Sequence, residues 1–436
     1  MRKPQFIIAA PTSNSGKTTV TLGLLRALKN RGISTQPFKV GPDYIDPKFH
    51  KIASGLDGVN LDLFMMDEDH IKSTYSDYSK GKEAVCIEGV MGLFDGAKRS
   101  ERSTAELAKL LQLPIIFVVD AKSVAYSVAP LLFGFKNFDK ELNIAGVIFN
   151  RVNTKSHYMF LEEACEDVGI PSLGHLPFIE DCKIASRHLG LCIDKIEENE
   201  TIIEKVAQAM EESIDIDLLL EFCSIEESVL KTTNPTAEKE KLTIAVAKDD
   251  AFNFSYIQNI KCLESKGKIH YFSPLKDEQL PKADLVYFPG GYPEYFTKQL
   301  AENNSMLYSI KSFADAGGKI IAECGGMMYL GRSIIDKQGK EFPTVNVFNF
   351  TTSMTTMKLK LGYRKSVING FELLGHEFHY SKIYNDEDIK SIGESYSARG
   401  TQVDTKIYQY KNTIASYTHY YWGKEELLNE ILALLK

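Results

Sequence analysis

This chain of 436 residues lacks the features that mark several specialised classes of protein. Its seven cysteines are scattered, with no CxxC pair and no spacing typical of metal ligands, so they indicate reduced thiols rather than a disulfide framework. No apolar run is long enough for a transmembrane helix or a signal peptide, and no repeat or low-complexity tract occurs. We therefore expect a cytoplasmic protein without a membrane partner.

An excess of positive charge is also lacking. The chain has 51 Lys and Arg residues against 58 Asp and Glu residues, which gives a formal net charge of −7 at pH 7. Binding along a nucleic-acid backbone needs clustered basic side chains, so this balance argues against a nucleic-acid partner. The negative net charge is still compatible with a local basic pocket that binds a small anion. The length favours two or three domains, and 44% hydrophobic residues are ordinary for a globular protein.

The first part of the chain alternates short apolar runs with amphipathic segments. We expect strands at residues 6–10, 35–40, 84–90, 114–120, 144–150 and 172–176. Helical patterns cover residues 17–29, 104–111 and 156–168. Nearly continuous apolar strands separated by helices predict a parallel sheet covered on both faces. This defines an α/β domain over residues 1–192.

The pattern then changes and restarts. Residues 193–240 combine a Glu-rich helical segment with a polar stretch, which we interpret as the linker between domains. From residue 241 a second α/β domain follows, with strands expected at 242–247, 268–272, 284–288 and 319–322. Alternation at 371–380 and 406–410 predicts antiparallel pairs near the end of the chain.

A candidate phosphate-binding loop lies between the first strand and the first helix. Its members are Ser15, Gly16, Lys17, Thr18 and Thr19. In this position backbone N–H groups can hold an anion, Lys17 can reach the outer phosphates and Thr18 can ligate Mg²⁺. Pro11 replaces the first glycine of the full motif, and an incidental Gly-Lys-Thr turn is the alternative reading.

Acidic residues follow the next strands, where the loops of an open α/β sheet line a ligand crevice. They are Asp43, Asp46, Glu88 and Asp95. Carboxylates near a phosphate loop are typical of a Mg²⁺ site, and Lys39 would neutralise a substrate carboxylate or the transferred phosphoryl group. Turn formation and helix capping are the alternatives for the aspartates. Asn150, at another strand end, would either read a base edge or cap its turn.

A candidate nucleophile lies in the second domain. Residues 318–330 are typical of a strand, a sharp elbow at Cys324 and a helix, whose N-terminus would lower the pKa of the thiol. Backbone N–H groups of Gly325 and of Gly291, in a second glycine turn, would form an oxyanion hole. A buried apolar cysteine is the alternative, and we keep it for Cys86, Cys165 and Cys262.

A thiolate nucleophile needs an imidazole partner, and the chain has nine histidines. His419 follows a late strand, whereas His376 and His379 share the segment GHEFHYS. Spacing alone does not choose among the three. Because a third ligand is missing, a zinc site built on His376 and His379 is disfavoured.

Over essentially its whole length, the chain resembles the cobyrinate a,c-diamide synthases, glutamine-dependent amidotransferases of corrinoid biosynthesis. The combination of motifs is more specific than any one of them. The motif GHEFHYS separates these enzymes from the similar cobyric acid synthases. The motifs are SGKTTVTLGL at 15–24, VGPDYIDP at 40–47, EGVMGLFDG at 88–96, PGGYPE at 289–294, ECGGMMYL at 323–330 and GHEFHYS at 375–381.

The resemblance implies a P-loop domain similar to dethiobiotin synthetase, followed by a class I glutamine amidotransferase-like domain. It assigns the base to His419, with Tyr421 where class I enzymes usually carry glutamate, and so implies a Cys–His dyad. On the same resemblance, the ATP, Mg²⁺ and carboxylate-activation site comprises Lys17, Thr18, Asp43, Asp46, Glu88 and Asp95.

The implied activity is that of a carbon–nitrogen ligase. ATP and glutamine would drive amidation of the a and c acetate carboxylates of cobyrinate, through an acyl phosphate, to give cobyrinate a,c-diamide in cobalamin biosynthesis. Hydrogenobyrinate and nickel-sirohydrochlorin are alternative substrates for the same chemistry. A P-loop ATPase with a non-catalytic C-terminal binding module and a cysteine hydrolase with a vestigial nucleotide domain are alternatives of other classes. The sequence leaves the oligomeric state open, with a homodimer as one option.

Overall fold

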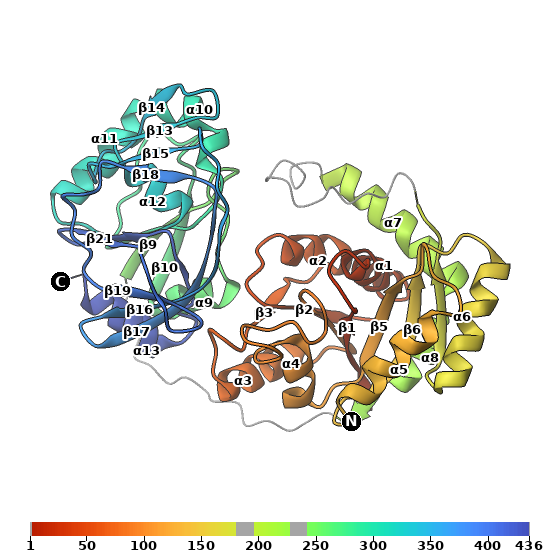
Figure 1. Cartoon of the computed structure of the whole chain (residues 1–436). Helices are drawn as coiled ribbons and strands as arrows, with labels where there is room; N and C mark the ends of the chain where they lie inside the picture. Colours follow the sequence, from red (N-terminus) through yellow and green to blue (C-terminus); the bar gives the residue numbers. More distant parts are fainter. Residues whose placement is uncertain (1, 180–195, 227–241, 436) are drawn as a thin grey trace. The chain divides into compact units, whose positions relative to one another are not determined.

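The computed structural model describes residues 2–179, 196–226 and 242–435, which divide between two compact units, Met1–Asn234 and Pro235–Lys436 (Figure 1). The first unit contains β1 (Arg2–Ala9), α1 (Lys17–Asn30), β2 (Thr35–Val40), α2 (Asp46–Ser54), β3 (Val59–Leu61), α3 (Glu68–Ser79), β4 (Ala84–Glu88), α4 (Thr104–Leu111), β5 (Ile115–Asp120), α5 (Val128–Phe138), β6 (Ile144–Asn150), α6 (Lys155–Val168), β7 (Ser172–Leu176), α7 (Ile196–Ser213), α8 (Ile216–Phe222) and β8 (Ser224–Glu226).

The second unit begins with β9 (Leu242–Ala247), α9 (Ile257–Lys266), β10 (Gly267–Phe272), β11 (Leu285–Phe288), the 3-10 helix η1 (Pro293–Tyr295), α10 (Thr297–Glu302), α11 (Asn304–Asp315), β12 (Lys319–Glu323) and α12 (Gly325–Leu330). It continues with β13 (Ser333–Ile335), β14 (Glu341–Pro343), β15 (Thr351–Ser353), β16 (Lys360–Ile368), β17 (Phe371–His379), β18 (Lys382–Tyr384), β19 (Glu394–Ser397), β20 (Gln402–Val403), β21 (Ile407–Tyr410), β22 (Thr413–Ser416), β23 (His419–Tyr420) and α13 (Glu425–Ala433).

The first unit is built on the predicted parallel sheet. Its strand order is β3-β2-β4-β1-β5-β6-β7, and every pair along this path is parallel. The six strands expected from the apolar runs are confirmed. The sequence reading missed the short strands β3 and β8, of which β8 pairs antiparallel with β1.

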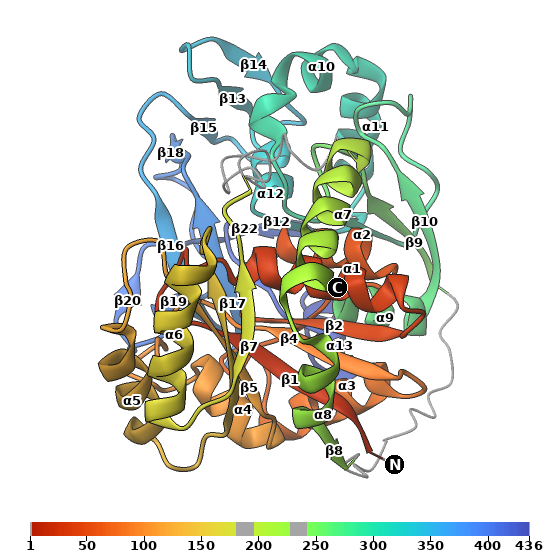
Figure 2. The same ribbon diagram turned by 90° about the vertical axis from the view of Figure 1, so that its right-hand side faces the viewer.

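Both faces of this sheet are covered by helices, as the near-continuous apolar strands require. Residues of α1, α7 and α8 share one core with alternate strand residues such as Ile8 and Ile116. On the other face, Phe135 of α5 contacts Phe117 of β5, with ring centroids 4.8 Å apart. In the turned view of Figure 2, α7 crosses α1, and the two helices are in contact. Among the described residues, no helix combines the length and the hydrophobicity needed to cross a membrane.

Residues 193–240 were expected to form a helical segment and linker between the domains. Their described part instead packs on the first unit. Helix α7 packs on α1, where Arg26 pairs with Glu200 at 2.5 Å and with Glu204 at 3.1 Å. Helix α8 and strand β8 also belong to the first unit. These residues therefore extend the first domain beyond the predicted boundary at 192, while 227–241 lie outside the described residues.

The second unit contains a six-stranded sheet of order β10-β9-β11-β12-β22-β21. All neighbouring strands in it are parallel except β21 and β22. The strands expected at 242–247, 268–272, 284–288 and 319–322 are confirmed as β9 to β12. The antiparallel pairing expected near the end of the chain is also present, in β16 with β17 and in β21 with β22.

Candidate functional site

The predicted phosphate loop lies between β1 and α1, at the carboxyl end of a central strand. Gly16 has a φ of 101°, in the left-handed region that favours glycine. A side chain would also collide there, since a Cβ would lie 2.0 Å from Nδ2 of Asn150. Lys17 is buried, and its Nζ donates to the carbonyl of Met91 at 2.5 Å. The loop therefore keeps its lysine among backbone oxygens.

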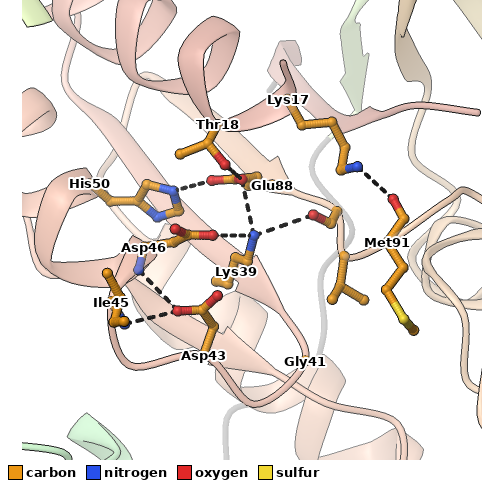
Figure 3. A network of polar contacts seen from close by, with 12 residues as sticks. Lys17, Thr18, Lys39, Gly41, Asp43, Ile45, Asp46, His50, Glu88 and Met91 are labelled. Carbon is orange, nitrogen blue, oxygen red and sulfur yellow. Dashed lines mark hydrogen bonds and ion pairs between the residues drawn. The ribbon is translucent and has the colours of Figure 1, made fainter. Parts of the chain in front are cut away.

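A buried cluster of charged side chains lies beside this loop (Figure 3). Lys39 on β2 and Glu88 on β4 are partners in the strand register, and Lys39 Nζ lies 3.0 Å from Glu88 Oε1. The same Nζ lies 2.6 Å from Asp46 Oδ2, at the start of α2. Thr18 donates to Glu88 Oε1 at 2.6 Å, and His50 Nε2 lies 2.6 Å from Glu88 Oε2. We call these five side chains the Glu88 cluster.

The charges in the Glu88 cluster stabilise one another. Burial alone would lower the pKa of Lys39, but the carboxylates of Asp46, Glu88 and Asp43 outweigh it and raise this pKa. Burial would raise the pKa of Glu88, yet Lys39, His50 and Thr18 hold it well below its usual range. Lys39, with a side chain only 1% exposed, is thus the counter-ion of two carboxylates here. Its predicted role at a transferred phosphoryl group stays a prediction.

Two of the predicted acidic residues serve the turns that contain them. Asp43 Oδ1 accepts from the backbone N–H groups of Ile45 and Asp46, at 2.8 and 3.0 Å. Asp95 is exposed, and its Oδ2 accepts from the N–H of Gly92 at 2.9 Å. Both carboxylates therefore make the turn contacts that the alternative interpretation requires, and their role at a Mg²⁺ or substrate site stays a prediction.

Asn150 braces the phosphate loop. From the end of β6 its Nδ2 donates to the carbonyl of Ser15 at 3.1 Å, and its Oδ1 accepts from the N–H of Arg151 at 3.0 Å. Asn150 was expected either to read a base edge or to cap its turn, and these hydrogen bonds are those of a residue that caps a turn. Thr19 lies in the first turn of α1 and is half-buried.

Sequence reasoning missed His50, which is fully buried against Glu88. The signal that would have found it is its position four residues after Asp46 on α2, because residues at this spacing share one helix face. That face places both side chains over the end of β4. His50 therefore belongs to the site by geometry.

The oxygen donors around Thr18 suit a magnesium ion. Mg²⁺ takes oxygen ligands, uses one or two carboxylates and keeps several waters or phosphate oxygens. The hydroxyl of Thr18 and the carboxylate of Glu88 already meet at 2.6 Å, beside the loop that would hold the phosphates. Within the described ranges, no group of three or more His, Cys, Asp or Glu side chains has metal-binding geometry.

In the second unit, Cys324 occupies the predicted elbow between β12 and α12. Its φ and ψ are 46° and −105°, a conformation that is strained for a residue other than glycine. Strand β12 lies between β11 and β22, which end in the Gly290–Gly291 turn and in the segment before His419. Because these strands are parallel, their carboxyl ends bring the three features to one edge of the sheet.

His419 lies directly over the glycine turn. A Cβ on Gly290 would lie 2.1 Å from Cε1 of its ring. The ring stacks on that of His376, with centroids 4.9 Å apart and an interplanar angle of 13°, and the two residues pair in register between β23 and β17. The hydroxyl of Tyr256 lies 2.9 Å from Nδ1 of His376. The structure thus places His376 against the predicted base.

The two glycines predicted to form an oxyanion hole lie close together. A Cβ on Gly325 would lie 3.0 Å from the backbone nitrogen of Gly291 and 2.9 Å from its carbonyl oxygen. The backbones of Gly325 and Gly291 are therefore in close contact beside Cys324, and the oxyanion hole built from their N–H groups stays a prediction.

The segment GHEFHYS supplies a buried polar network beside Cys324. Glu377 Oε2 accepts from Arg364 Nε at 2.5 Å and from Thr405 Oγ1 at 2.8 Å, and its Oε1 lies 2.7 Å from His379 Nε2. The ring of His379 stacks on Tyr417 with centroids 3.6 Å apart. Sequence reasoning left His376 and His379 without a role, and the structure places this network beside Cys324.

The protonation of the nucleophile differs from the prediction. Burial raises the pKa of Cys324, the carboxylates of Glu294 and Glu377 raise it further, and the N–H of Gly325 opposes them only in part. Burial also lowers the pKa of His419, together with His376 and His379. The expectation of a thiol with a lowered pKa is therefore wrong for this state. Both shifts favour the neutral thiol and the neutral imidazole.

Comparison with known proteins gives two family matches. A family model described as "CobQ/CobB/MinD/ParA nucleotide binding domain" matches residues 6–191. A second, described as "CobB/CobQ-like glutamine amidotransferase domain", matches residues 243–427. The first match contains the phosphate loop and the Glu88 cluster, and the second contains Cys324 and His419.

Full-length relatives are similar along almost the whole chain. The protein named "Cobyrinate a,c-diamide synthase" of Listeria innocua is 40% identical and covers 95% of both chains. A protein of the same name from Picrophilus torridus is 38% identical and covers 99% of this chain and 98% of its own length. "Hydrogenobyrinate a,c-diamide synthase" of Brucella anthropi is 40% identical over 95% of this chain and 97% of its own.

Proposed function

The chain belongs to the family of cobyrinate and hydrogenobyrinate a,c-diamide synthases, and on that premise we propose that it amidates the a and c acetate carboxylates of cobyrinate, using ATP and glutamine. The observation that carries this proposal is the convergence of Cys324, His419 and the Gly290–Gly291 turn at one sheet edge, in a chain that also has a phosphate loop. One site would release ammonia, and the other would activate the carboxylate that receives it.

At the cysteine site the chemistry is acyl transfer. The thiol of Cys324 gives its proton to His419 and attacks the side-chain amide carbon of glutamine. The N–H groups of Gly291 and Gly325 stabilise the oxyanion of the tetrahedral intermediate. The C–N bond breaks as the nitrogen takes a proton from His419, so ammonia leaves and a thioester remains. Water hydrolyses the thioester to glutamate and restores the thiol.

At the phosphate site ATP phosphorylates a peripheral carboxylate of the macrocycle. A carboxylate is a poor electrophile because its charge is delocalised, whereas the acyl phosphate has a good leaving group. Lys17 and the N–H groups of the loop bind the phosphates, and Ser15 and Asn150 keep the loop in shape. Ammonia displaces phosphate to give the amide.

The polar side chains around the phosphate loop would have two roles, which are binding of Mg²⁺ and positioning of the substrate carboxylate. Thr18, Glu88 and Asp43 would hold Mg²⁺, which compensates phosphate charge when bound. Lys39, Asp46 and Asp95 would position the carboxylate that is activated. The raised pKa of Lys39 supports this, because the residue keeps its positive charge beside the phosphoryl donor throughout.

Hydrogenobyrinate is the second candidate substrate, favoured by the relative of that name at 40% identity. The chemistry of the two sites would be unchanged, since the two macrocycles share the same acetate groups. The cytoplasmic location and the homodimer stay predictions.

The test compares Cys324→Ala with Cys262→Ala, a control at another buried cysteine of the same unit. Each purified protein receives Mg·ATP and cobyrinate, with either glutamine or ammonium chloride, and amide formation is followed by mass spectrometry. We expect Cys324→Ala to lose amidation with glutamine and to keep it with ammonium, while the control behaves as wild type. Wild-type rates with glutamine in Cys324→Ala would refute the assignment of the nucleophile.

A further inference from the structure

Glu294 lies beside the nucleophile and takes no part in the mechanism described so far. It belongs to η1, which follows the Gly290–Gly291 turn and packs on α12. Its neighbour Pro293 touches the residue after the nucleophile, since a Cβ on Gly325 would lie 2.8 Å from Cδ of Pro293. The negative charge of Glu294 acts on both Cys324 and Tyr417.

The carboxyl group of Glu294 is incompletely satisfied. Its Oε2 is buried and accepts no hydrogen bond from any side chain or backbone group in the described ranges. Burial raises the pKa of Glu294 to about 7, and its own N–H and Lys337 oppose this only in part. Ionisation is therefore costly in this pocket, and a cation that binds there would recover that cost.

The other buried carboxylates near the elbow already have partners. Both oxygens of Glu377 are engaged, by Arg364, Thr405 and His379. Glu323 accepts from the indole of Trp422 at 3.1 Å, from the hydroxyl of Tyr287 at 2.9 Å and from a backbone N–H. Of these three carboxylates, Glu294 is thus the one with an open acceptor next to Cys324.

We propose that Glu294 binds the α-ammonium group of free glutamine and so selects the amino-acid form of the amide. The inference rests on the proposed function, because it requires glutamine as the nitrogen donor. When the amide carbon of glutamine lies at Cys324, its ammonium group is only a short carbon chain away. An ammonium donates up to three hydrogen bonds and compensates the carboxylate charge, whereas an amide without this group offers neither.

The test uses two amides that differ only at the α-carbon, glutamine and glutaramate, which lacks the amino group. Ammonia release without a corrinoid acceptor gives kcat/KM for each amide in wild type, in Glu294→Gln and in Glu302→Gln, an exposed control on the next helix. We expect the preference of Glu294→Gln for glutamine to fall roughly ten- to a hundredfold, mainly through KM, as loss of a charged hydrogen bond implies. The control should keep the wild-type preference.

Two results would overturn the inference: an unchanged preference for glutamine in Glu294→Gln, or an equal loss for both amides, which would indicate a purely structural role. If Glu294→Gln does not fold, Glu294→Asp decides, because it keeps the charge and moves it by one methylene group. A raised KM for glutamine alone supports the inference, and an equal change for both amides refutes it. Amidation of cobyrinate with ammonium is measured separately, and its absence in wild type would refute the proposed substrate instead.

Discussion

Replacing Gly290 by alanine should displace the imidazole of His419 without touching the nucleophile. A Cβ at residue 290 would lie 2.1 Å from Cε1 and 2.8 Å from Nδ1 of this ring. Ordinary contact begins near 3.4 Å, so the ring or the strand must move by about 1.3 Å (3.4 − 2.1). The backbone cannot easily give way, because the carbonyl of Gly290 accepts from the N–H groups of Asn253 and Phe254, each at 3.0 Å.

The expected loss is large for so small a change. A misplacement of about 1 Å costs on the order of a hundredfold in rate, which corresponds to about 2.7 kcal/mol of transition-state stabilisation. The ring of His419 also loses its stack on His376 when it moves. We therefore expect kcat/KM for ammonia release from glutamine to fall about a hundredfold in Gly290→Ala.

The assay measures glutamate from glutamine and, in parallel, amidation of cobyrinate with ammonium chloride. The second activity should stay at the wild-type level, because the phosphate loop and the Glu88 cluster belong to the other unit. Gly134→Ala is a matched control, since a Cβ there meets open space. If Gly290→Ala releases glutamate at the wild-type rate, His419 is not held where the structure has it, and its role as base fails.

Two further substitutions test buried charges. Glu88→Gln removes the charge that balances Lys39, so the free energy of unfolding in urea should fall by about 3–5 kcal/mol and amidation should stop with either nitrogen source. Unchanged values of both would contradict the stabilising role of the Glu88 cluster. For Glu377 the folded pKa is lowered from 4.5 to about 2, so its contribution to stability is complete above pH 4.5 and is lost as the pH falls toward 2. The stability difference between wild type and Glu377→Gln should therefore shrink by about 3 kcal/mol over this pH range. A constant difference would show that the contacts of Glu377 with His379 and Arg364 are not its source.

Much of the fold and of both candidate sites could be predicted from the sequence, for one physical reason. Strands of a parallel sheet are buried on both faces and appear as apolar runs, and their carboxyl ends meet at one edge. A polar residue directly after such a run is therefore placed by the run itself. The sequence alone therefore groups Lys17, Glu88 and Asn150 at one edge of the first sheet, and Cys324 with Gly291 at one edge of the second.

What the sequence could not predict depends on contacts between distant residues. The choice of His419 over His376 was open from spacing alone, and the structure shows the two rings stacked across a pair of antiparallel strands. The protonation of Cys324 was predicted wrongly because a helix N-terminus is visible in the sequence, whereas the burial that outweighs it is not. The extension of the first unit by α7 was missed because its partner, Arg26, lies about 170 residues earlier.

The protonation of the cysteine site has a consequence for how the thiol of Cys324 is activated. A thiol and an imidazole that are both neutral in the free protein do not form a reactive thiolate. The carboxylates of Glu294 and Glu377 contribute to this, because each disfavours negative charge on Cys324. An ammonium group at Glu294 would compensate one of the opposing charges. Binding of the correct amide would then lower the pKa of the thiol at the moment when its amide carbon is in place, which couples recognition of glutamine to activation of the nucleophile.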